Sequence, residues 1–331
     1  MARNFLIDHI LTDYVRLLGP QLGAFLSDDP DVCPTKDVPT ESGKYHDVLG
    51  GFASAPPEGD RSGLVLTDDE MLPRHISVDV TTADGWNVQP TALGVRLNYE
   101  KIRKARREGL DLRAAKVAVL TRVRKAWRDL ELANLLFSTT TFAGRNATPA
   151  NLWDTDAGDP VADMLFARSE IVKSSGEMLD GLIVGFEVHE ALQNSAKIKS
   201  YIKYEFGSAA AGPLSEDLMR RAFGLRFYKV GTAPYNAGLP GTPAASNSFI
   251  WGKHALFVKN RRVSSPMTPQ SCVQRWRMRP GGQDADRAIG DGQVRRYPLT
   301  GGYLEQIDLL NNDQFGVPTP ELGWLFTNVV S

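Results

Sequence analysis

The sequence has few of the residues from which metal and redox sites are built. Its 331 residues include only two cysteines and five histidines. Cys33 and Cys272 fit no metal-ligand spacing, and none of the histidines is paired at such a spacing. We therefore expect no metal site and no cofactor. The low cysteine content favours a reducing compartment with free thiols over a disulfide.

Catalytic motifs are also missing. There is no G-x-S-x-G, no Walker loop and no dinucleotide glycine fingerprint after a predicted strand. His189-Glu190 begins a near match to the zinc-protease motif, but Gln193 stands where the second histidine is required. The acidic pairs Asp28-Asp29 and Asp68-Asp69 lie in predicted loops, where turn formation and solvation explain them. We expect the protein not to be an enzyme.

Long apolar runs are missing as well. The longest, such as GLIVGF at 181–186, are far too short to cross a bilayer. The N-terminal residues MARNFLIDHI carry charges where a signal peptide needs an apolar core. Hydrophobic residues at 42% and charged residues at 23% are typical of a globular protein. We expect a protein made in a cytoplasm, without membrane contact.

The charges are present in balanced number but are distributed unevenly. Residues 1–95 hold six basic and fifteen acidic residues, a net charge of −9. Residues 96–128 hold twelve basic and three acidic residues, a net charge of +9, and the remaining chain is near neutral. The stretch KIRKARR, residues 101–107, alone holds five positive charges. Such a cluster suits phosphates or an acidic protein surface, and a solvated face explains it equally.

The N-terminal quarter predicts an arm and a long excursion. Residues 4–18 place apolar side chains at helical spacing and predict a short amphipathic helix. From about Ser27 the chain loses periodicity, and prolines at positions 30, 34 and 39 favour extended backbone. Residues 50–63 predict a loop, and HISVDV at 75–80 predicts a strand. This segment has too little apolar surface to fold alone, so we expect it to lie on something else.

The strongest helix signal covers residues 111–137. Gly109 is a predicted end of the preceding basic helix, and Asp111 is a predicted N-cap. The new helix spans roughly 27 residues, or ~40 Å. Basic side chains lie off its apolar stripe, and Arg124 is predicted to be exposed. The predicted buried stripe consists of Leu112, Ala115, Val119, Val123, Ala126, Leu130, Ala133 and Phe137.

The rest of the chain alternates helices and strands. Asp159-Pro160 is typical of a helix start and Gly176 of a helix end. A strand at 181–186 is followed by a predicted helix at 187–202 and by another helix that begins after Ser215. Further strands are predicted at 225–233, 249–259, 272–278, 293–299, 303–310 and 323–330. The predicted class is α+β, without an internal repeat.

The order of these elements resembles the A-domain of tailed-bacteriophage major capsid proteins. In that family a strand ending in Val-Gly leads into a helix, a second helix ends at Phe-Gly, and a Trp-Gly strand follows a variable loop. The corresponding positions here are Val184-Gly185, Phe223-Gly224 and Trp251-Gly252. The final segment ELGWLFTNVV also resembles the last strand of the family. Encapsulin shells share this fold.

The resemblance covers nearly the whole chain and implies a division into parts. It implies an α+β capsid fold with an N-arm, an extended E-loop, a P-domain built on a long spine helix, and an A-domain. An arm and a ribbon that cannot bury their own surface would be stabilised by lying across neighbouring subunits. The implied ranges are 1–45 for the N-arm, 46–90 for the E-loop, 91–180 for the P-domain with the spine helix, 181–265 for the A-domain, 266–317 for the P-domain return strands, and 318–331 for the final A-domain strand.

The function implied by the resemblance is that of a major capsid protein, which self-assembles into an icosahedral shell around double-stranded DNA. Expected partners are further copies of the chain, in pentamers and hexamers, and DNA packaged without sequence preference. Separate scaffolding, portal and cement proteins are further expected partners. The expected location is the virion, after assembly in the host cytoplasm. Two alternatives stay open: an encapsulin-type nanocompartment shell and an unrelated cytoplasmic enzyme.

The sequence departs from the family in the residues available for a crosslink between subunits. Some members crosslink an E-loop lysine to a neighbour, but no lysine lies between Lys44 and Lys101 here, so we expect no such crosslink.

In the family the E-loop lies over the neighbour's P-domain. The opposite charges of the two segments then predict an electrostatic contact between subunits. The predicted contact residues are Asp60, Asp68, Asp69 and Glu70 on one subunit, and Lys101, Arg103, Lys104, Arg106, Arg107 and Arg124 on the other.

Overall fold

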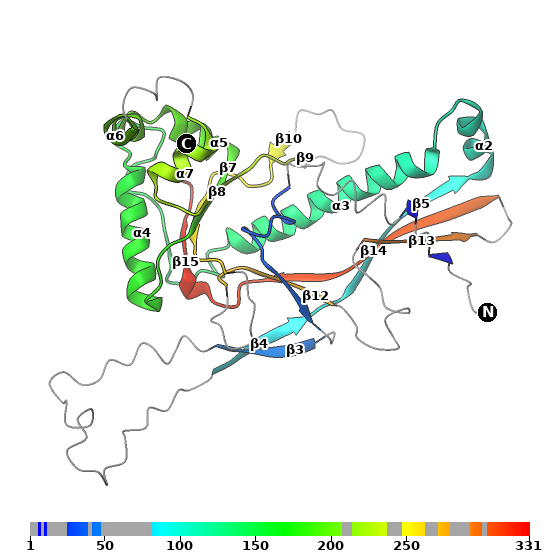
Figure 1. The fold of residues 1–331 in the computed structure, drawn as a ribbon, viewed down its shortest axis with the longest axis horizontal. Helices are drawn as coiled ribbons and strands as arrows, with labels where there is room; N and C mark the ends of the chain where they lie inside the picture. The colour runs from blue at the N-terminus through cyan, green and yellow to red at the C-terminus, as the bar shows by residue number, and fades with distance from the viewer. Residues whose placement is uncertain are drawn as a thin grey trace, which may run out of the picture.

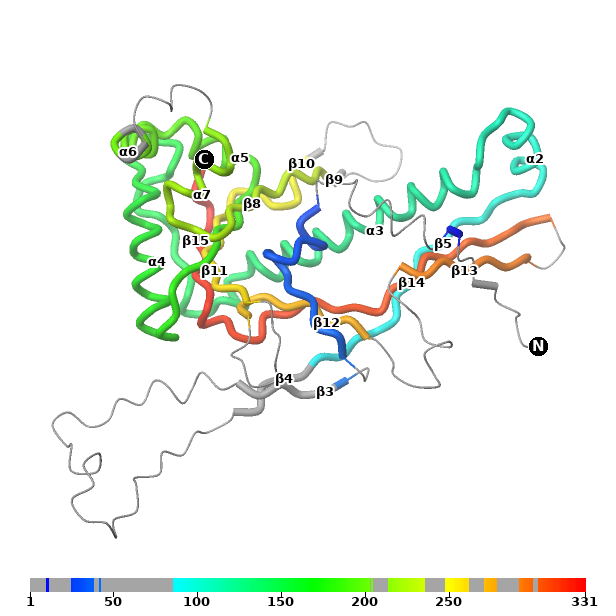
Figure 2. The backbone as a smooth tube through the Cα atoms, in the orientation of Figure 1, coloured from blue at the N-terminus to red at the C-terminus, as the bar shows by residue number. Residues whose placement is uncertain are grey.

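The computed structural model of the protein describes residues 6–7, 10–11, 25–38, 42–47, 81–206, 214–236, 247–261, 271–278, 292–299 and 303–331. Two larger sheets and one long helix, α3 (Leu112–Leu136), dominate the described part (Figure 1). The helix begins at the far end of the second sheet and runs back to the first. In the tube view the C-terminal strands, coloured orange to red, pass from the second sheet into the first (Figure 2).

The first sheet has five strands in the order β6-β15-β11-β7-β8. Its central strands β7 (Gly181–Gly185), β11 (Ala255–Val258) and β15 (Gly323–Phe326) are buried along their whole length. Burial on both faces explains why these strands read as continuous apolar runs rather than as alternating patterns. β7 pairs with β8 (Phe227–Gly231) in parallel, and β15 pairs in parallel with the short strand β6 (Asn146–Ala147) at the opposite edge.

Four helices surround this sheet. Trp153, Met164 and Ile171 belong to the apolar core that the helices share with the sheet. The predicted strand at 249–259 is divided, because only β11 joins this sheet and a turn at Trp251-Gly252 precedes it. The four helices are α4 (Pro160–Ser175), α5 (Phe186–Asn194), α6 (Ala196–Phe206) and α7 (Glu216–Ala222).

The second sheet is built on the 13-residue strand β14 (Leu304–Gly316), which is longer than the predicted strand at 303–310. β14 pairs antiparallel with β13 (Gln293–Pro298) and β12 (Gln274–Met278) along one edge. Along its other edge it pairs antiparallel with β5 (Pro90–Asn98) over the full length of β5. The sheet therefore offers one long surface, and the N-terminal half of α3 packs on it.

Short N-terminal strands extend the second sheet. β1 (Leu6–Ile7) pairs with β13, and β2 (Thr35–Val38) pairs in parallel with β12. The predicted helix at 4–18 is therefore wrong at Leu6–Ile7, because pairing with β13 overrides the helical pattern there. Ile10 and Leu11 are helical, and the rest of that prediction lies outside the described residues.

Two further ribbons complete the described strands. β3 (Ser42–Asp47) pairs with β4 (Thr81–Asn87), and β9 (Pro234–Asn236) pairs with β10 (Asn247–Phe249). The predicted loop at 50–63 and the predicted strand at 75–80 lie outside the described residues.

Helix ends agree closely with the local signals. The side chain of Asp159 accepts a hydrogen bond from the Ala162 backbone N–H, and α4 ends at Gly176 with a left-handed φ of 69°. Ser215 likewise caps α7 through the Leu218 N–H. The predicted helix at 187–202 is in fact two helices, since the backbone turns extended at Ser195.

α2 (Tyr99–Arg107) and α3 meet in a tight turn. The Asn98 side chain caps α2, and Gly109 follows its C-terminus with a left-handed φ of 77°. Asp111 accepts hydrogen bonds from the backbone N–H groups of Arg113 and Ala114, so the predicted N-cap of the long helix is confirmed.

The face that α3 buries differs from the prediction. Val123 is 37% exposed and Val119 is 56% exposed, so the prediction that Val123 is buried is wrong. Leu130 is half-buried against the core beneath the first sheet. Part of the helix face that was predicted to be exposed is buried, because several polar side chains of α3 point inward. A count of apolar residues cannot detect such positions. The buried residues of α3 are Val117, Leu120, Thr121, Lys125, Arg128, Asp129, Leu132, Ala133 and Leu136.

α3 contributes to two apolar cores. Its N-terminal half packs Val117 and Leu120 against Leu97 and Ile307 of the second sheet. Its C-terminal half packs on the first sheet and on the arm, through a cluster that includes Leu132, Leu136, Leu26, Val32, Ile183 and Leu256. The helix thus fixes the arm and both sheets relative to one another.

Candidate assembly surface

Residues 25–38, which we call the arm, lie against α3 and are held there by ion pairs between the partly exposed Asp28 and buried cations. The carboxylate of Asp28 pairs with Lys125 Nζ at 2.8 Å, Arg128 Nη1 at 3.1 Å and Arg275 Nη1 at 3.4 Å. Asp313 of β14 pairs with Arg128 Nη2 at 2.6 Å and Arg275 Nε at 2.7 Å. We call these five residues the arm-spine cluster. It joins the arm, α3 and two strands of the second sheet.

The charges of the arm-spine cluster stabilise one another. Burial alone raises the pKa of Asp28, but the Coulomb attraction of Arg128, Lys125 and Arg275 outweighs it. The pKa of this carboxyl is therefore held well below its usual value of 3.8. The side chains of Arg128, Arg275 and Asp313 are less than a tenth exposed, so the loss of one partner leaves a charge without compensation.

A second anchor lies one residue further along α3. Asp129 accepts hydrogen bonds from the backbone N–H groups of Leu26 at 3.1 Å and Ser27 at 2.8 Å, and from Trp251 Nε1 at 3.1 Å. Burial raises the pKa of Asp129, and these hydrogen bonds offset only part of the effect. The carboxyl therefore ties the start of the arm to α3 and to the turn before β11.

The other acidic residues of the arm are also paired within the chain. The backbone of the same segment is held as well, because Asn260 Nδ2 donates hydrogen bonds to the backbone oxygens of Asp31 and Val32. The prediction that solvation explains Asp28-Asp29 is wrong, since both carboxylates make ion pairs that the fold brings together. The remaining pairs are Asp29 with Lys229 at 2.7 Å, Asp31 with Arg226 at 3.6 Å, and Asp37 with Arg277 at 2.8 Å.

The basic helix α2 differs from the arm-spine cluster. It lies at the far end of α3 and buries only Ala105 (Figure 1). Within the described ranges, none of its five cations makes an ion pair, and all are exposed. This surface can attract an acidic partner without first breaking contacts within the subunit. The five cations are Lys101, Arg103, Lys104, Arg106 and Arg107.

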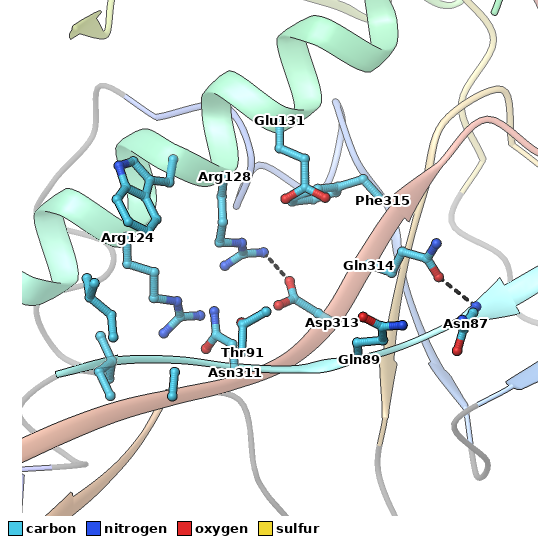
Figure 3. Close-up of a pocket in the computed structure, with 14 residues that line it drawn as sticks. Asn87, Gln89, Thr91, Arg124, Arg128, Glu131, Asn311, Asp313, Gln314 and Phe315 are labelled. Atoms are coloured by element: carbon cyan, nitrogen blue, oxygen red, sulfur yellow. Dashed lines mark hydrogen bonds and ion pairs between the residues drawn. The ribbon is translucent and has the colours of Figure 1, made fainter. Parts of the chain in front are cut away.

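A groove of about 660 Å³ opens between α3 and the second sheet. Arg124 and Arg128 reach from α3 toward β5 and β14, where Arg128 meets Asp313 (Figure 3). Thr91, Ala92 and Leu93 of β5 form part of its floor. Trp127 of α3 lines the groove and is 62% exposed, an unusual state for so large an apolar side chain.

The near match to a zinc motif has a structural explanation. His189 Nδ1 lies 2.8 Å from the Tyr228 hydroxyl, and Gln193 Nε2 lies 2.9 Å from His189 Nε2. Gln193 Nε2 also donates to the backbone oxygen of Leu214. Burial lowers the pKa of His189 and favours the neutral ring that these contacts require. In the part of the chain that the structure describes, no three His, Cys, Asp or Glu side chains are grouped to hold a metal ion.

Both cysteines are buried and free. Burial raises the pKa of Cys33 to about 12, and it raises the pKa of Cys272 as well. The expectation of free thiols is confirmed, and the thiolate form is disfavoured at both positions.

Comparison with known proteins identifies the fold. No known family profile matches the sequence, and no curated protein matches it. A phage-related protein from Bordetella bronchiseptica RB50 superposes with a TM-score of 0.72, covering 99% of each chain at 17% identity. The chain has the tailed-phage capsid fold.

Two other solved structures support this capsid fold with nearly complete coverage. A prophage protein of Escherichia coli CFT073, described as its capsid protein, matches with a TM-score of 0.52 and 12% identity, covering 97% of this chain and 99% of that one. The virus-like particle of Pyrococcus furiosus matches with a TM-score of 0.51 and 12% identity, covering 96% and 98%. The fold class predicted from the sequence is therefore confirmed.

The predicted contact residues occupy different places in the capsid fold. The five α2 cations form one exposed group, and Arg124 lies apart from them, half-buried in the groove. Asp60, Asp68, Asp69 and Glu70 lie outside the described residues, so the predicted contact stays a prediction. No helix in the described ranges has both the length and the apolar character needed to span a membrane.

Sequence reasoning missed the residues that fix the arm. The sequence places Lys125 and Arg128 in one basic segment that is predicted to contact a neighbour, but both pair with Asp28 of the same chain. A signal was present, because Lys125, Arg128 and Leu132 recur at steps of three and four with buried apolar residues. The partners Arg275 and Asp313 are distant in sequence and carried no such signal.

Proposed function

We propose that this protein is a major capsid protein that self-assembles into an icosahedral shell around double-stranded DNA. The observation that carries the proposal is the end-to-end superposition on the phage-related protein of Bordetella bronchiseptica, with 99% coverage of both chains. The proposed assemblies are pentamers and hexamers that close into a shell through heterologous contacts. The proposed location is the virion, after assembly in the host cytoplasm.

The same proposal assigns partners other than further copies of the chain. DNA would be packaged without sequence preference, and separate scaffolding, portal and cement proteins would complete the particle. The chain itself would perform no catalysis. A turnover measured for a soluble monomer or small oligomer would instead support an unrelated cytoplasmic enzyme.

The proposed contact between subunits joins acidic and basic surfaces. The exposed cations of α2, together with Arg124, would receive Asp60, Asp68, Asp69 and Glu70 of an adjacent subunit. The cations at the C-terminal end of this basic stretch are excluded, because Lys125 and Arg128 already pair with Asp28. Each exposed pair contributes only ~0–1 kcal/mol, but the contact repeats throughout a shell and fixes the register between subunits.

Electron microscopy of the purified protein tests the assembly, since a closed shell is visible directly. Reversal of Asp68, Asp69 and Glu70 to Lys should then impair assembly without unfolding the subunit. Reversal of Asp156 and Glu190, two exposed acidic residues of the first-sheet region, is the matched control and should leave assembly intact. Shells should also lose stability at 1 M salt, where the Debye length is ~3 Å. Normal assembly of the triple variant, or native shells whose stability does not change with salt, would contradict the proposed contact.

A second candidate function is an encapsulin-type nanocompartment shell. The match to the virus-like particle of Pyrococcus furiosus is as good as the match to the Escherichia coli prophage protein, with TM-scores of 0.51 and 0.52. Nuclease treatment of purified particles separates the two candidates. Protected DNA inside the particles supports the capsid protein, whereas a protein cargo without DNA supports the nanocompartment.

The shell is expected to be held together without covalent links through the E-loop. No lysine lies between Lys44 and Lys101, so the amine required for an amide crosslink is missing. Boiled particles should run on a denaturing gel as one band near 36.4 kDa. A ladder of multiples that survives reductant would contradict this prediction.

A further inference from the structure

A buried imidazole joins three elements of the first-sheet region. His189 of α5 is 8% exposed, and its Nδ1 lies 2.8 Å from the hydroxyl of Tyr228 on β8. Its Nε2 lies 2.9 Å from Nε2 of Gln193, one helical turn further along α5. The same nitrogen of Gln193 donates to the backbone oxygen of Leu214 at 2.7 Å. Because Leu214 directly precedes Ser215, the N-cap of α7, these contacts connect α5 with β8 and with the start of α7.

These contacts fix the protonation state of the ring. The amide nitrogen of a glutamine has two N–H donors and no acceptor. Because Leu214 takes one hydrogen of Gln193, the other points to His189, whose Nε2 must accept it. The ring proton therefore lies on Nδ1, which donates it to the Tyr228 oxygen. The opposite orientation of the Gln193 amide is excluded, because it would set two acceptors against each other at Leu214.

A second ring proton finds no acceptor in this arrangement. A protonated imidazole donates from both nitrogens, so the hydrogen on Nε2 would face the N–H of Gln193. Only a rotation of the Gln193 amide turns its oxygen toward the ring, and that rotation breaks the hydrogen bond to Leu214. Without the rotation, two donors face each other in a buried site, which is unfavourable. Protonation of His189 and the contact with Leu214 therefore exclude one another.

The surroundings of the ring oppose its charged form. Among the described residues, β8 and α7 bring it two ionisable groups, Tyr228 and Glu216. Lys229 of β8 points to the opposite face of the sheet, where it pairs with Asp29, and β7 has no ionisable residue. No described charge of α5 or α6 acts on the ring. The carboxylate of Glu216 favours a positive ring, but burial outweighs it and lowers the pKa of His189.

We propose that His189, Gln193 and the backbone oxygen of Leu214 form a pH-sensitive latch, which holds the start of α7 at neutral pH and releases it when His189 takes up a second ring proton. The latch lies within one subunit, so the inference goes beyond the proposed shell function and does not depend on it. The folded protein binds this proton less tightly than an unfolded chain does. The stabilisation is therefore complete above the usual histidine pKa of 6.5 and is lost progressively as the pH falls below it.

Release of the latch acts on α7 rather than on the sheet. Leu214 is 1% exposed and belongs to the same apolar core as Met219 of α7. The Met219 N–H donates to the backbone oxygen of Ser215, so the first turn of α7 begins directly after the latch. The central strands β7 and β11 are held by their own hydrogen bonds and lie outside the latch. The state expected at low pH is therefore a loosened α7 on an intact sheet.

Hydrogen exchange of the native full-length protein tests the latch. Protection factors, which correct for the pH dependence of exchange in free peptides, are measured for the amides of α7 from about pH 7.5 to about pH 5. They should fall by about fivefold, as expected for the loss of one hydrogen bond. The protection of β7 and β11 should not change. Constant protection of α7, or an equal loss in the two strands, would overturn the inference.

Two histidine variants identify the residue that senses the pH. His189→Gln keeps an acceptor for Gln193 but takes up no proton in this range, so the protection of α7 should no longer depend on pH. His254→Gln is the matched control, because burial also lowers the pKa of His254, whose Nδ1 accepts a hydrogen bond from the Asn328 N–H. This control should retain the native pH dependence. If His189→Gln retained it as well, His189 would not be the sensor.

A nitrogen NMR titration of the native protein decides the question even where His189→Gln does not fold. The two ring nitrogens of His189 have different chemical shifts in the two neutral tautomers. The hydrogen bonds require the proton on Nδ1 at neutral pH and a proton on each nitrogen at low pH. The loss of α7 protection should follow the same titration. A neutral ring with its proton on Nε2 would contradict the latch.

Discussion

The two ends of the basic segment are built from the same kinds of residue but have opposite environments. At the N-terminal end, the cations of α2 are exposed and make no ion pair within the described part of the chain. At the C-terminal end, Lys125 and Arg128 are buried and share the carboxylates of Asp28 and Asp313. The difference lies in what the rest of the chain brings to each end, because the described residues bring no carboxylate into an ion pair with α2, whereas they bring Asp28 and Asp313 to the C-terminal end.

This contrast separates two uses of charge in one helix pair. A buried, paired cation fixes the arm to the subunit, and its loss leaves an uncompensated charge. An exposed cation contributes little to the subunit alone and remains available to a partner. The acidic residues of the described N-terminal segment belong to the first kind, since Asp28, Asp29, Asp31 and Asp37 pair within the chain.

The largest expected effect comes from breaking the buried end. Asp313→Ala removes the carboxylate that faces both Arg128 and Arg275 and should lower the free energy of unfolding by ~3–5 kcal/mol. Lys104→Ala at the exposed end should change it by no more than about 0.5 kcal/mol. Urea unfolding of the two variants measures both values. Similar losses would mean that the two ends do not differ as the structure indicates.

The two faces of α3 give a somewhat smaller contrast. Leu132 is fully buried, so Leu132→Ala should cost ~2–5 kcal/mol through lost burial and the cavity that remains. Val119 is 56% exposed, and Val119→Ala should cost only about 0.5 kcal/mol. The same unfolding experiment compares them. If Val119→Ala lowered the free energy of unfolding more than Leu132→Ala, the face of α3 that the sequence predicts to be buried would be the correct one.

The pH dependence of the buried end is the smallest of the expected effects. The pKa of Asp28 is lowered in the folded protein, so its ion pairs stabilise the fold above 3.8 and are lost progressively as the pH falls below that value. Thermal unfolding should therefore show a steeper loss of stability below this pH for the native chain than for Asp28→Asn. Parallel acid curves for the two proteins would show that the pairs of Asp28 contribute nothing.

Local signals predicted much of this fold. The N-caps at Asp111, Asp159 and Ser215 and the ends at Gly109 and Gly176 are where the sequence placed them. These features depend on hydrogen bonds between residues a few positions apart, so a short window contains both partners. The α+β class and the order of the elements followed from the same local patterns.

Longer-range features were predicted poorly. The buried face of α3 was misassigned because three of its inward side chains, Lys125, Arg128 and Asp129, are charged. An apolar periodicity places such residues in water unless their partners are known. The exposed cations of α2 were easier to predict, because a solvated charge cluster needs no distant partner to be visible in a sequence, and their contact with a neighbour stays a prediction.

The sequence by itself determined the helix caps at Asp111, Asp159 and Ser215, the class of fold, and that acidic and basic segments of equal charge follow one another. Only the tertiary structure decided which charges are buried. Asp28 lies 100 residues from Arg128 and 247 residues from Arg275 in the chain, yet all three meet in one cluster. Such a contact exists because the packing of the arm, α3 and the second sheet places the charges together and excludes water, and no local pattern encodes that coincidence.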